Sequence, residues 1–308
     1  MDSKRHYFSL RSFFLSVAFL LLTGMFIACD SEEPPATRSV IPEYDAPPMS
    51  EMEKMFVKAV QNNRLDAARG NLADGVDPNL RDLRGRPMLV LAVSRGYSEM
   101  AMLLLEKGAN IEMADMSGYT PLITAAVEGR GDMARKFIER GANVKAQNIV
   151  GSTSLHHAAK AGDEDLVRSL VEAGAQVEIR NQEGFAPLHY AAQSGDVAVV
   201  KYLIAQGAYV DLPNRRDETP FFHAVDSNQF DAARFLAGKG ANLNAKNNLD
   251  TTPLHLAVKQ GNMPMVRFLL VSGAEVDPMD SQGHRPIDYA RMGSMDEVLK
   301  VLEPMSRD

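Results

Sequence analysis

Glycine recurs at intervals of 33 residues through most of this 308-residue chain, and this period limits the possible folds more than any other feature. Glycine adopts a positive φ without steric cost, and helices commonly end at such a residue. Three positions in each period therefore predict two helix ends and one turn per unit. Seventeen of the 22 glycines follow the period, in the series Gly75, Gly108, Gly141, Gly174, Gly207, Gly240 and Gly273, the series Gly96, Gly129, Gly162, Gly195 and Gly261, and the series Gly85, Gly118, Gly151, Gly184 and Gly283.

Other residues stand where glycine is missing from two of the series. Asn63, Asn228 and Ser294 fill the second series, and Asp217 and Asp250 fill the third. Asparagine is the residue that tolerates a positive φ best after glycine. The period therefore continues through these positions.

Apolar stretches between the glycines have the spacing of short helices. The second stretch of one unit places Val197, Val200, Leu203 and Ile204 on one predicted helix face. Proline is tolerated in the first turn of a helix, where its missing N–H has no partner to lose. The prolines at this position are Pro121, Pro187, Pro220, Pro253 and Pro286.

Short motifs accompany the period. Thr252-Pro-Leu-His-Leu-Ala and Ala186-Pro-Leu-His-Tyr-Ala-Ala are the fullest, and Thr153-Ser-Leu-His-His-Ala-Ala keeps the pattern with Ser154 in place of proline. Together with Gly-Ala at the end of most units, these motifs resemble the ankyrin repeat. The resemblance implies an all-α repeat solenoid over residues 51–308, in which each unit is a helix-turn-helix with a β-turn or hairpin tip. It implies eight units with turns near residues 52, 85, 118, 151, 184, 217, 250 and 283, of which the first and last act as caps with polar outer faces.

The N-terminus is typical of an exported protein. A short basic start precedes an apolar run over residues 13–28, so we expect residues 1–28 to be a signal peptide. Phe26-Ile27-Ala28-Cys29 resembles the lipobox of bacterial lipoproteins, which implies a lipid on Cys29. An uncleaved signal anchor and a cleaved secretory peptide are the alternatives, and all three place the bulk of the protein outside the cytoplasm.

Residues 29–50 are predicted to be a tether between the lipid and the repeats. Five prolines and several acids leave this segment little apolar material with which to build a core. In enteric bacteria an aspartate after the lipidated cysteine favours retention at the inner membrane. Asp30 therefore points to the inner membrane, within a general expectation of a periplasmic or envelope location.

Composition and motifs argue against several functions. Residues 51–308 hold 29 Lys and Arg against 34 Asp and Glu, which offers no concentrated positive surface for nucleic acid. A single cysteine excludes an internal disulfide and argues against a thiolate zinc site. Nucleophile-elbow, Walker and dinucleotide motifs are absent from the sequence. We therefore expect no enzyme activity, no cofactor and no metal site.

Histidines and acids that repeat with the period are expected to be structural. In ankyrin repeats, the histidine at the position of His156, His189 and His255 binds backbone groups of the neighbouring turn. His157 and His223 lie one place further on, facing the concave side, but two units apart and too distant to share a metal. One Asp or Asn precedes each turn and is expected to brace it: Asp82, Asp115, Asn148, Asn181, Asn214, Asn247 and Asp280.

Residues that do not repeat are the candidates for partner recognition. Ankyrin proteins grip partners with their tips and inner helices, and aromatic residues, Met and Arg are enriched in interface cores. We therefore predict a contact surface of exposed tip and inner-helix side chains. Its members are Arg84, Arg86, Met116, Tyr119, Val127, Ile149, Val150, His157, Phe185, Tyr190, Arg215, Arg216 and His223.

The leading functional hypothesis is a monomeric, non-enzymatic protein-binding module in the bacterial cell envelope. It would bind another exported protein, for instance a periplasmic enzyme, and inhibit, mask or protect it. A structural scaffold that bridges two partners is the alternative, and an enzyme built on the repeat frame is the third class.

Overall fold

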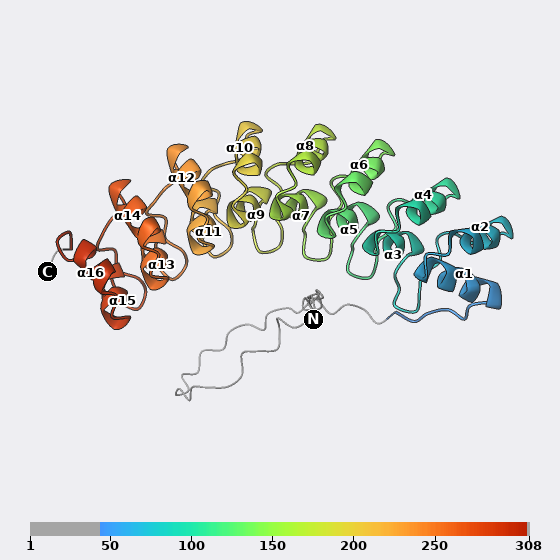
Figure 1. The fold of residues 1–308 in the computed structure, drawn as a ribbon, viewed down its shortest axis with the longest axis horizontal. Coiled ribbons are helices and arrows are strands. Elements are labelled where there is room, and N and C mark those ends of the chain that lie inside the picture. The colour runs from blue at the N-terminus through green and yellow to red at the C-terminus, as the bar shows by residue number, and fades with distance from the viewer. Residues whose placement is uncertain (1–43, 307–308) are drawn as a thin grey trace, which may run out of the picture. The chain divides into compact units, whose positions relative to one another are not determined.

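The computed structural model describes residues 44–306, in which sixteen helices form eight successive pairs (Figure 1). We number the pairs as units 1 to 8. In each pair the first, or inner, helix lies on the side of the connecting turns, which we call tips, and the second, or outer, helix lies on the opposite side. The inner helices are α1 (Glu51–Gln61), α3 (Met88–Ser94), α5 (Pro121–Val127), α7 (Ser154–Ala161), α9 (Pro187–Ser194), α11 (Pro220–Asp226), α13 (Pro253–Lys259) and α15 (Pro286–Met292). The outer helices are α2 (Leu65–Ala73), α4 (Ser98–Glu106), α6 (Gly131–Glu139), α8 (Glu164–Glu172), α10 (Val197–Ala205), α12 (Phe230–Gly238), α14 (Met263–Val271) and α16 (Asp296–Leu302).

The glycine period is confirmed in the backbone. Every one of the seventeen periodic glycines has a positive φ, between 63° and 96°. The five residues that replace glycine share this conformation, with φ between 52° and 60°. The predicted prolines stand at the first turn of α5, α9, α11, α13 and α15. The all-α repeat solenoid is therefore correct, and no strand occurs in residues 44–306.

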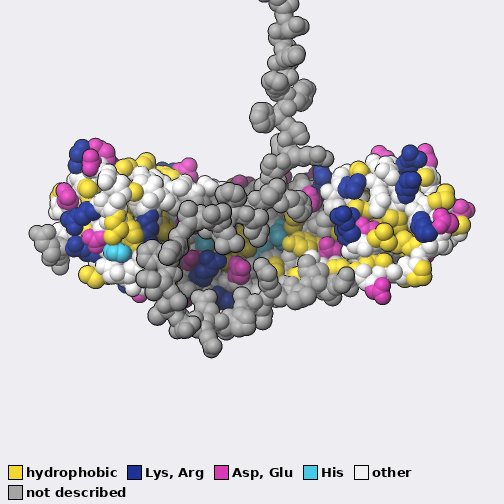
Figure 2. Space-filling model, turned by 90° about the horizontal axis from the view of Figure 1, so that it is seen from below, with side chains coloured by type: hydrophobic (Ala, Val, Ile, Leu, Met, Phe, Trp, Pro, Cys, Tyr) yellow, Lys and Arg dark blue, Asp and Glu magenta, His cyan; other side chains and the backbone are white. Residues whose placement is uncertain are grey.

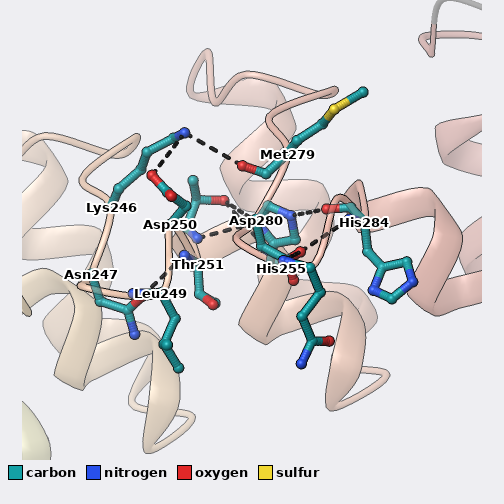
Figure 3. Close-up of polar contacts among 11 residues, drawn as sticks. Lys246, Asn247, Leu249, Asp250, Thr251, His255, Met279, Asp280 and His284 are labelled. Carbon is teal, nitrogen blue, oxygen red and sulfur yellow. Dashed lines mark hydrogen bonds and ion pairs between the residues drawn. The ribbon is translucent and has the colours of Figure 1, made fainter. Parts of the chain in front are cut away.

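A side-chain oxygen braces each of the seven tips, in units 2 to 8. The Asp or Asn at the start of the tip accepts hydrogen bonds from the backbone N–H groups two and four residues later, at 2.8–3.1 Å. Figure 3 shows this arrangement for Asn247, which accepts from Leu249 and Thr251. The backbone N–H of the same residue donates to the carbonyl four residues on, which closes the turn. The predicted bracing role is confirmed.

Buried histidines join neighbouring tips. His255 Nδ1 accepts from Thr252 N at 3.1 Å, and Nε2 lies 3.1 Å from the carbonyl oxygen of His284 in the next unit (Figure 3). His156 makes the same pair of contacts, to Thr153 N and to the Phe185 carbonyl. Nδ1 of His189 likewise accepts from the backbone of its own unit. Nε2 of His189 has no hydrogen-bond partner among the described residues, so the predicted contact with the neighbouring turn is confirmed for His156 and His255.

Backbone hydrogen bonds also join consecutive tips from unit 3 to unit 8. Ile149 N donates to Ser117 O at 3.0 Å, and Gln182 N donates to Val150 O at 2.9 Å. The same contact recurs 33 residues later through three further steps. These bonds fix each tip of this segment to the next one.

The hydrophobic core runs through all eight units, between inner and outer helices. In α10, Val199, Val200 and Leu203 are fully buried, whereas the predicted core residues Val197 and Ile204 are only half-buried. An outer helix packs through one narrow face, so the flanking positions stay near solvent.

The first unit departs from the expected pattern. The turn predicted near residue 52 is wrong, because α1 already begins at Glu51. Ser50 and Glu53 form a capping box, in which each side chain binds the other's backbone N–H, and no glycine interrupts the helix. This cap also exposes Met52 and Met55, by 44% and 62%, so its surface is less polar than predicted.

The predicted signal peptide, Cys29, Asp30 and most of the tether lie outside the described residues. Within residues 44–306, none of the helices combines the length and the apolar character needed to cross a membrane.

Periodic glycines that lie against the next tip should tolerate substitution by alanine less well than those that face open space. Gly118 and Gly141 have similar φ values, 78° and 81°, but a Cβ on Gly118 would lie 2.9 Å from the Asn148 Cα, whereas one on Gly141 meets nothing within 4 Å. Gly141→Ala should cost about 1–2 kcal/mol, the penalty of a left-handed backbone. Gly118→Ala should cost clearly more in urea unfolding. Equal losses would show that the close approach of the tips contributes nothing.

Stability should fall as the pH is lowered from 6.5 towards 4. Burial lowers the pKa of His156 to about 4 and that of His189 to about 3, so both stay neutral in the folded protein while the unfolded chain takes up protons. Each such histidine removes about 1.4 kcal/mol of unfolding free energy per pH unit in this window. His156→Phe, which introduces the residue found at this position as Phe222, should reduce the slope in urea unfolding. An unchanged slope would contradict this origin.

Candidate functional site

The candidate site is the inner face, which we define as the tips and the inner helices. The exposed candidates on it are Val127 and Val150, with 45% and 42% of their surface accessible, together with three arginines. Figure 2 views the side of the tips and shows hydrophobic side chains interspersed with Lys and Arg. The three exposed arginines are Arg84, Arg215 and Arg216.

Five further candidates are half-buried on the same face. Met116 and Ile149 stand in the tips of units 3 and 4. The ring centroids of Tyr119, in unit 3, and His157, in unit 4, are 6.1 Å apart, so the two side chains connect these units. Tyr190 accepts a hydrogen bond from Asn181 Nδ2 at 3.1 Å, and burial raises the pKa of its hydroxyl.

Three predicted contact residues are placed differently from expectation. Phe185 is 7% and His223 is 6% exposed, so neither offers a surface to a partner. Phe185 packs against His189, Tyr190 and His223, with ring centroids 4.9–5.5 Å apart. Arg86 is engaged within its own tip, where its guanidinium binds Asp82 at 2.8 and 3.0 Å. Phe185 and His223 thus hold neighbouring units together, whereas Arg86 stabilises its own tip.

A buried carboxylate accompanies His223 in unit 6. Glu218 Oε2 accepts from Asn214 Nδ2 at 2.8 Å and lies 3.4 Å from His223 Nε2. Burial raises the pKa of Glu218, but the hydrogen bonds from His223 and Asn214 and the charges of His223 and Arg216 outweigh it, so the pKa is lowered below 4.5. Glu218 is therefore ionised and held by two donors.

His157 occupies the equivalent position in unit 4, but no carboxylate accompanies it there. Burial lowers its pKa to about 4, and the nearby His156 and Lys160 add to the effect. Its Nε2 has no hydrogen-bond partner among the described residues, and neither do Asn148 Nδ2 and Thr124 Oγ1. Sequence analysis assigned Asn148 a purely structural role and overlooked Thr124, Lys160 and Glu218. A comparison of residues 152 and 218, which occupy the same place in two units, could have found the difference.

No group of three or more His, Cys, Asp or Glu side chains in residues 44–306 is arranged to hold a metal ion. His157 and His223 stand in separate environments, the first beside Tyr119 and the second beside Phe185. The inner face of the described chain thus combines exposed apolar and basic side chains with several buried polar atoms that lack partners, among them those of Thr124, Asn148 and His157.

Comparison with known proteins agrees with this architecture. A family model described as ankyrin repeats (3 copies) matches residues 56–148 and 155–247, and one described as ankyrin repeats (many copies) matches residues 236–290. A search of curated proteins finds no match. Members of this family are typically non-enzymatic and bind other proteins. The matched segments cover well over half of the sequence, and the chain belongs to the ankyrin-repeat family.

Proposed function

We propose that this protein is a binding module of the bacterial cell envelope that grips an exported protein through its inner face. The observation that carries the proposal is the exposure of Val127 and Val150 on one side of units 3 and 4, with the exposed Arg84, Arg215 and Arg216 in the tips on either side. Exposed apolar side chains next to arginine are typical of interface centres.

Binding through this face would mask the partner's surface rather than change it chemically. The tips are held to one another by backbone hydrogen bonds between neighbouring units, so the surface is formed before the partner arrives. A preformed surface loses little conformational entropy on association. Inhibition or protection of an exported enzyme by one bound copy is the function that fits such a clamp best.

The envelope location rests on the sequence of the N-terminus. The apolar run over residues 13–28 would direct export, and a lipid on Cys29 would anchor the module. The proline-rich segment up to residue 50 would then separate the repeats from the membrane, and Asp30 favours the inner membrane.

Replacing the exposed valines should weaken partner binding without unfolding the protein. Val127→Ser with Val150→Ser removes two apolar side chains from the inner face, and we expect at least tenfold weaker binding of the partner recovered by native pull-down from an envelope extract. The matched control is Val271→Ser, because Val271 is 90% exposed at the end of the outer helix α14. The control should bind as the wild type does.

Native mass spectrometry of the same complex distinguishes the two modes of action. One bound protein per chain agrees with a clamp, whereas two different proteins bound at once would favour a scaffold. If the double valine variant and the wild type bind with equal affinity, the inner face of units 3 and 4 is not the contact surface.

A further inference from the structure

The Asp or Asn that braces each tip stands nine residues before a position on the inner helix. In several units the side chains at these two positions lie within hydrogen-bond distance of each other. Asn181 Nδ2 donates to Tyr190 at 3.1 Å, and the hydroxyl of Tyr289 donates to Asp280 at 2.5 Å. In unit 6, Asn214 Nδ2 lies 3.2 Å from His223 Nε2. The fold therefore brings these two positions within hydrogen-bond distance in units 5, 6 and 8.

Unit 6 shows that an Asn–His pair at these positions can hold a carboxylate. The carboxylate of Glu218 lies against both nitrogens, 2.8 Å from Asn214 Nδ2 and 3.4 Å from His223 Nε2. Glu218 is 8% exposed, so this carboxylate is held away from solvent. Its two donors replace the water that it loses on burial.

Unit 4 has the same Asn–His pair without the carboxylate. Asn148 and His157 stand 66 residues before Asn214 and His223, but the residue equivalent to Glu218 is Ser152. The Ser152 hydroxyl is turned to the next unit, where it accepts from Asn181 Nδ2. Asn148 Nδ2 and His157 Nε2 are consequently left without partners in the described residues.

Unit 3 contributes a third buried polar atom without a hydrogen-bond partner. Thr124 occupies the His157 position of that unit, and its Oγ1 is buried and without a partner. Asn148 and Thr124 are each 6% exposed. Buried polar atoms normally find partners, and exceptions in a native fold require an explanation. All three atoms can donate a hydrogen bond, which matches an oxygen acceptor.

The charges around His157 favour an anion. Lys160 is the cation that acts on its imidazole, and it disfavours the protonated form of His157, as a positive neighbourhood does, whereas His156 is itself neutral. The ammonium of Lys160 is 5.8 Å from the centre of the Tyr190 ring, on the inner face one helical turn from His157. Tyr119 flanks His157 from unit 3.

We propose that Asn148 and His157 form a subsite for a carboxylate of the bound partner, which takes the place that Glu218 fills in unit 6. The subsite belongs to unit 4, whose tip carries the exposed Val150, and unit 3 before it carries the exposed Val127, so the proposal deepens the proposed function and rests on it. The apolar side chains would supply contact area, and the buried donors would select a partner with an acid at this point.

Acetate is the direct probe of this subsite. Acetate, titrated against chloride at equal ionic strength, should shift the Asn148 side-chain amide resonances in NMR spectra of the full chain. It should also raise the pKa of His157 by about one to three units, because a carboxylate stabilises the charged imidazole. Absence of both shifts would overturn the proposal.

A matched pair of variants locates the effect. Asn148→Asp retains the tip brace, since Asp already braces the tips at Asp82, Asp115 and Asp280, but it places a carboxylate oxygen in the subsite and should abolish the acetate response. Asn247→Asp makes the same change in unit 7, where Leu256 occupies the histidine position, and should leave the response intact. Equal responses in the two variants would place acetate elsewhere.

Exchanging residues between units 4 and 6 provides a reciprocal test. Glu218→Ser should open a second subsite, so that acetate shifts the Asn214 amide and the His223 ring as well. Ser152→Glu should fill the first subsite and remove the response of Asn148. Glu218→Ser keeps the proposal falsifiable if Ser152→Glu does not fold, because a folded Glu218→Ser variant that ignores acetate contradicts it.

Two peptides separate the possible sources of the carboxylate. One is acetyl-Gly-Glu-Gly-amide, with a side-chain acid only, and the other is acetyl-Gly-Gly with a free C-terminus. The peptide that shifts Asn148 and His157 in the wild type, but not in Asn148→Asp, identifies the source. If neither peptide shifts them although acetate does, a protein carboxylate is excluded and the proposal fails.

His157→Leu distinguishes failure of the subsite from failure of the proposed function. Leucine already stands at this position as Leu91 and Leu256, so the variant should fold and should resist urea at least as well as the wild type. Partner binding should weaken at least tenfold. Unchanged binding that still depends on Val127 and Val150 would reject the subsite and keep the proposed function.

Discussion

The hydrogen bonds accepted by one side-chain oxygen in each tip hold the inner face together. This oxygen binds the backbone N–H groups two and four residues on, which closes a turn too short to close through regular secondary structure. The closed turn presents its backbone to the next tip, 33 residues later, at about 3 Å. Because the tips of units 3 to 8 are each fixed to a neighbour, side chains at equivalent positions form a continuous surface on which partners can bind.

Differences between units carry the functional information in a repeat of this kind. In unit 6, the carboxylate of Glu218 contacts the side-chain nitrogens of Asn214 and His223. In unit 4, Ser152 stands at the position of Glu218, and Asn148 Nδ2 and His157 Nε2 have no partner among the described residues. An incomplete polar group is destabilising for the free protein, since each buried donor has lost its water. The unpartnered group and the exposed Val127 and Val150 belong to the neighbouring units 3 and 4, which is why we propose that a partner completes the group and covers the valines.

The periodic sequence pattern predicted the helix pairs, the seven turns of units 2 to 8, the bracing Asp and Asn residues and the backbone contacts of His156 and His255. These features depend on neighbours at fixed offsets within one period, so each can be read from spacing alone. Exposure of the tip residues could not be read in this way. Phe185 is a tip residue like Tyr119, yet it is buried because His189, Tyr190 and His223 surround it, and two of these rings belong to the following inner helix.

The sequence by itself determined the fold family and the number of helix pairs. The physical reason is that glycine, proline and asparagine act on the backbone of their own unit, where offsets are short and constant. Only the tertiary structure decided which polar side chains find partners. Asn148 and Asn214 have the same local motif, but whether a donor is satisfied depends on the residue that packing places opposite it, Ser152 in one unit and Glu218 in the other.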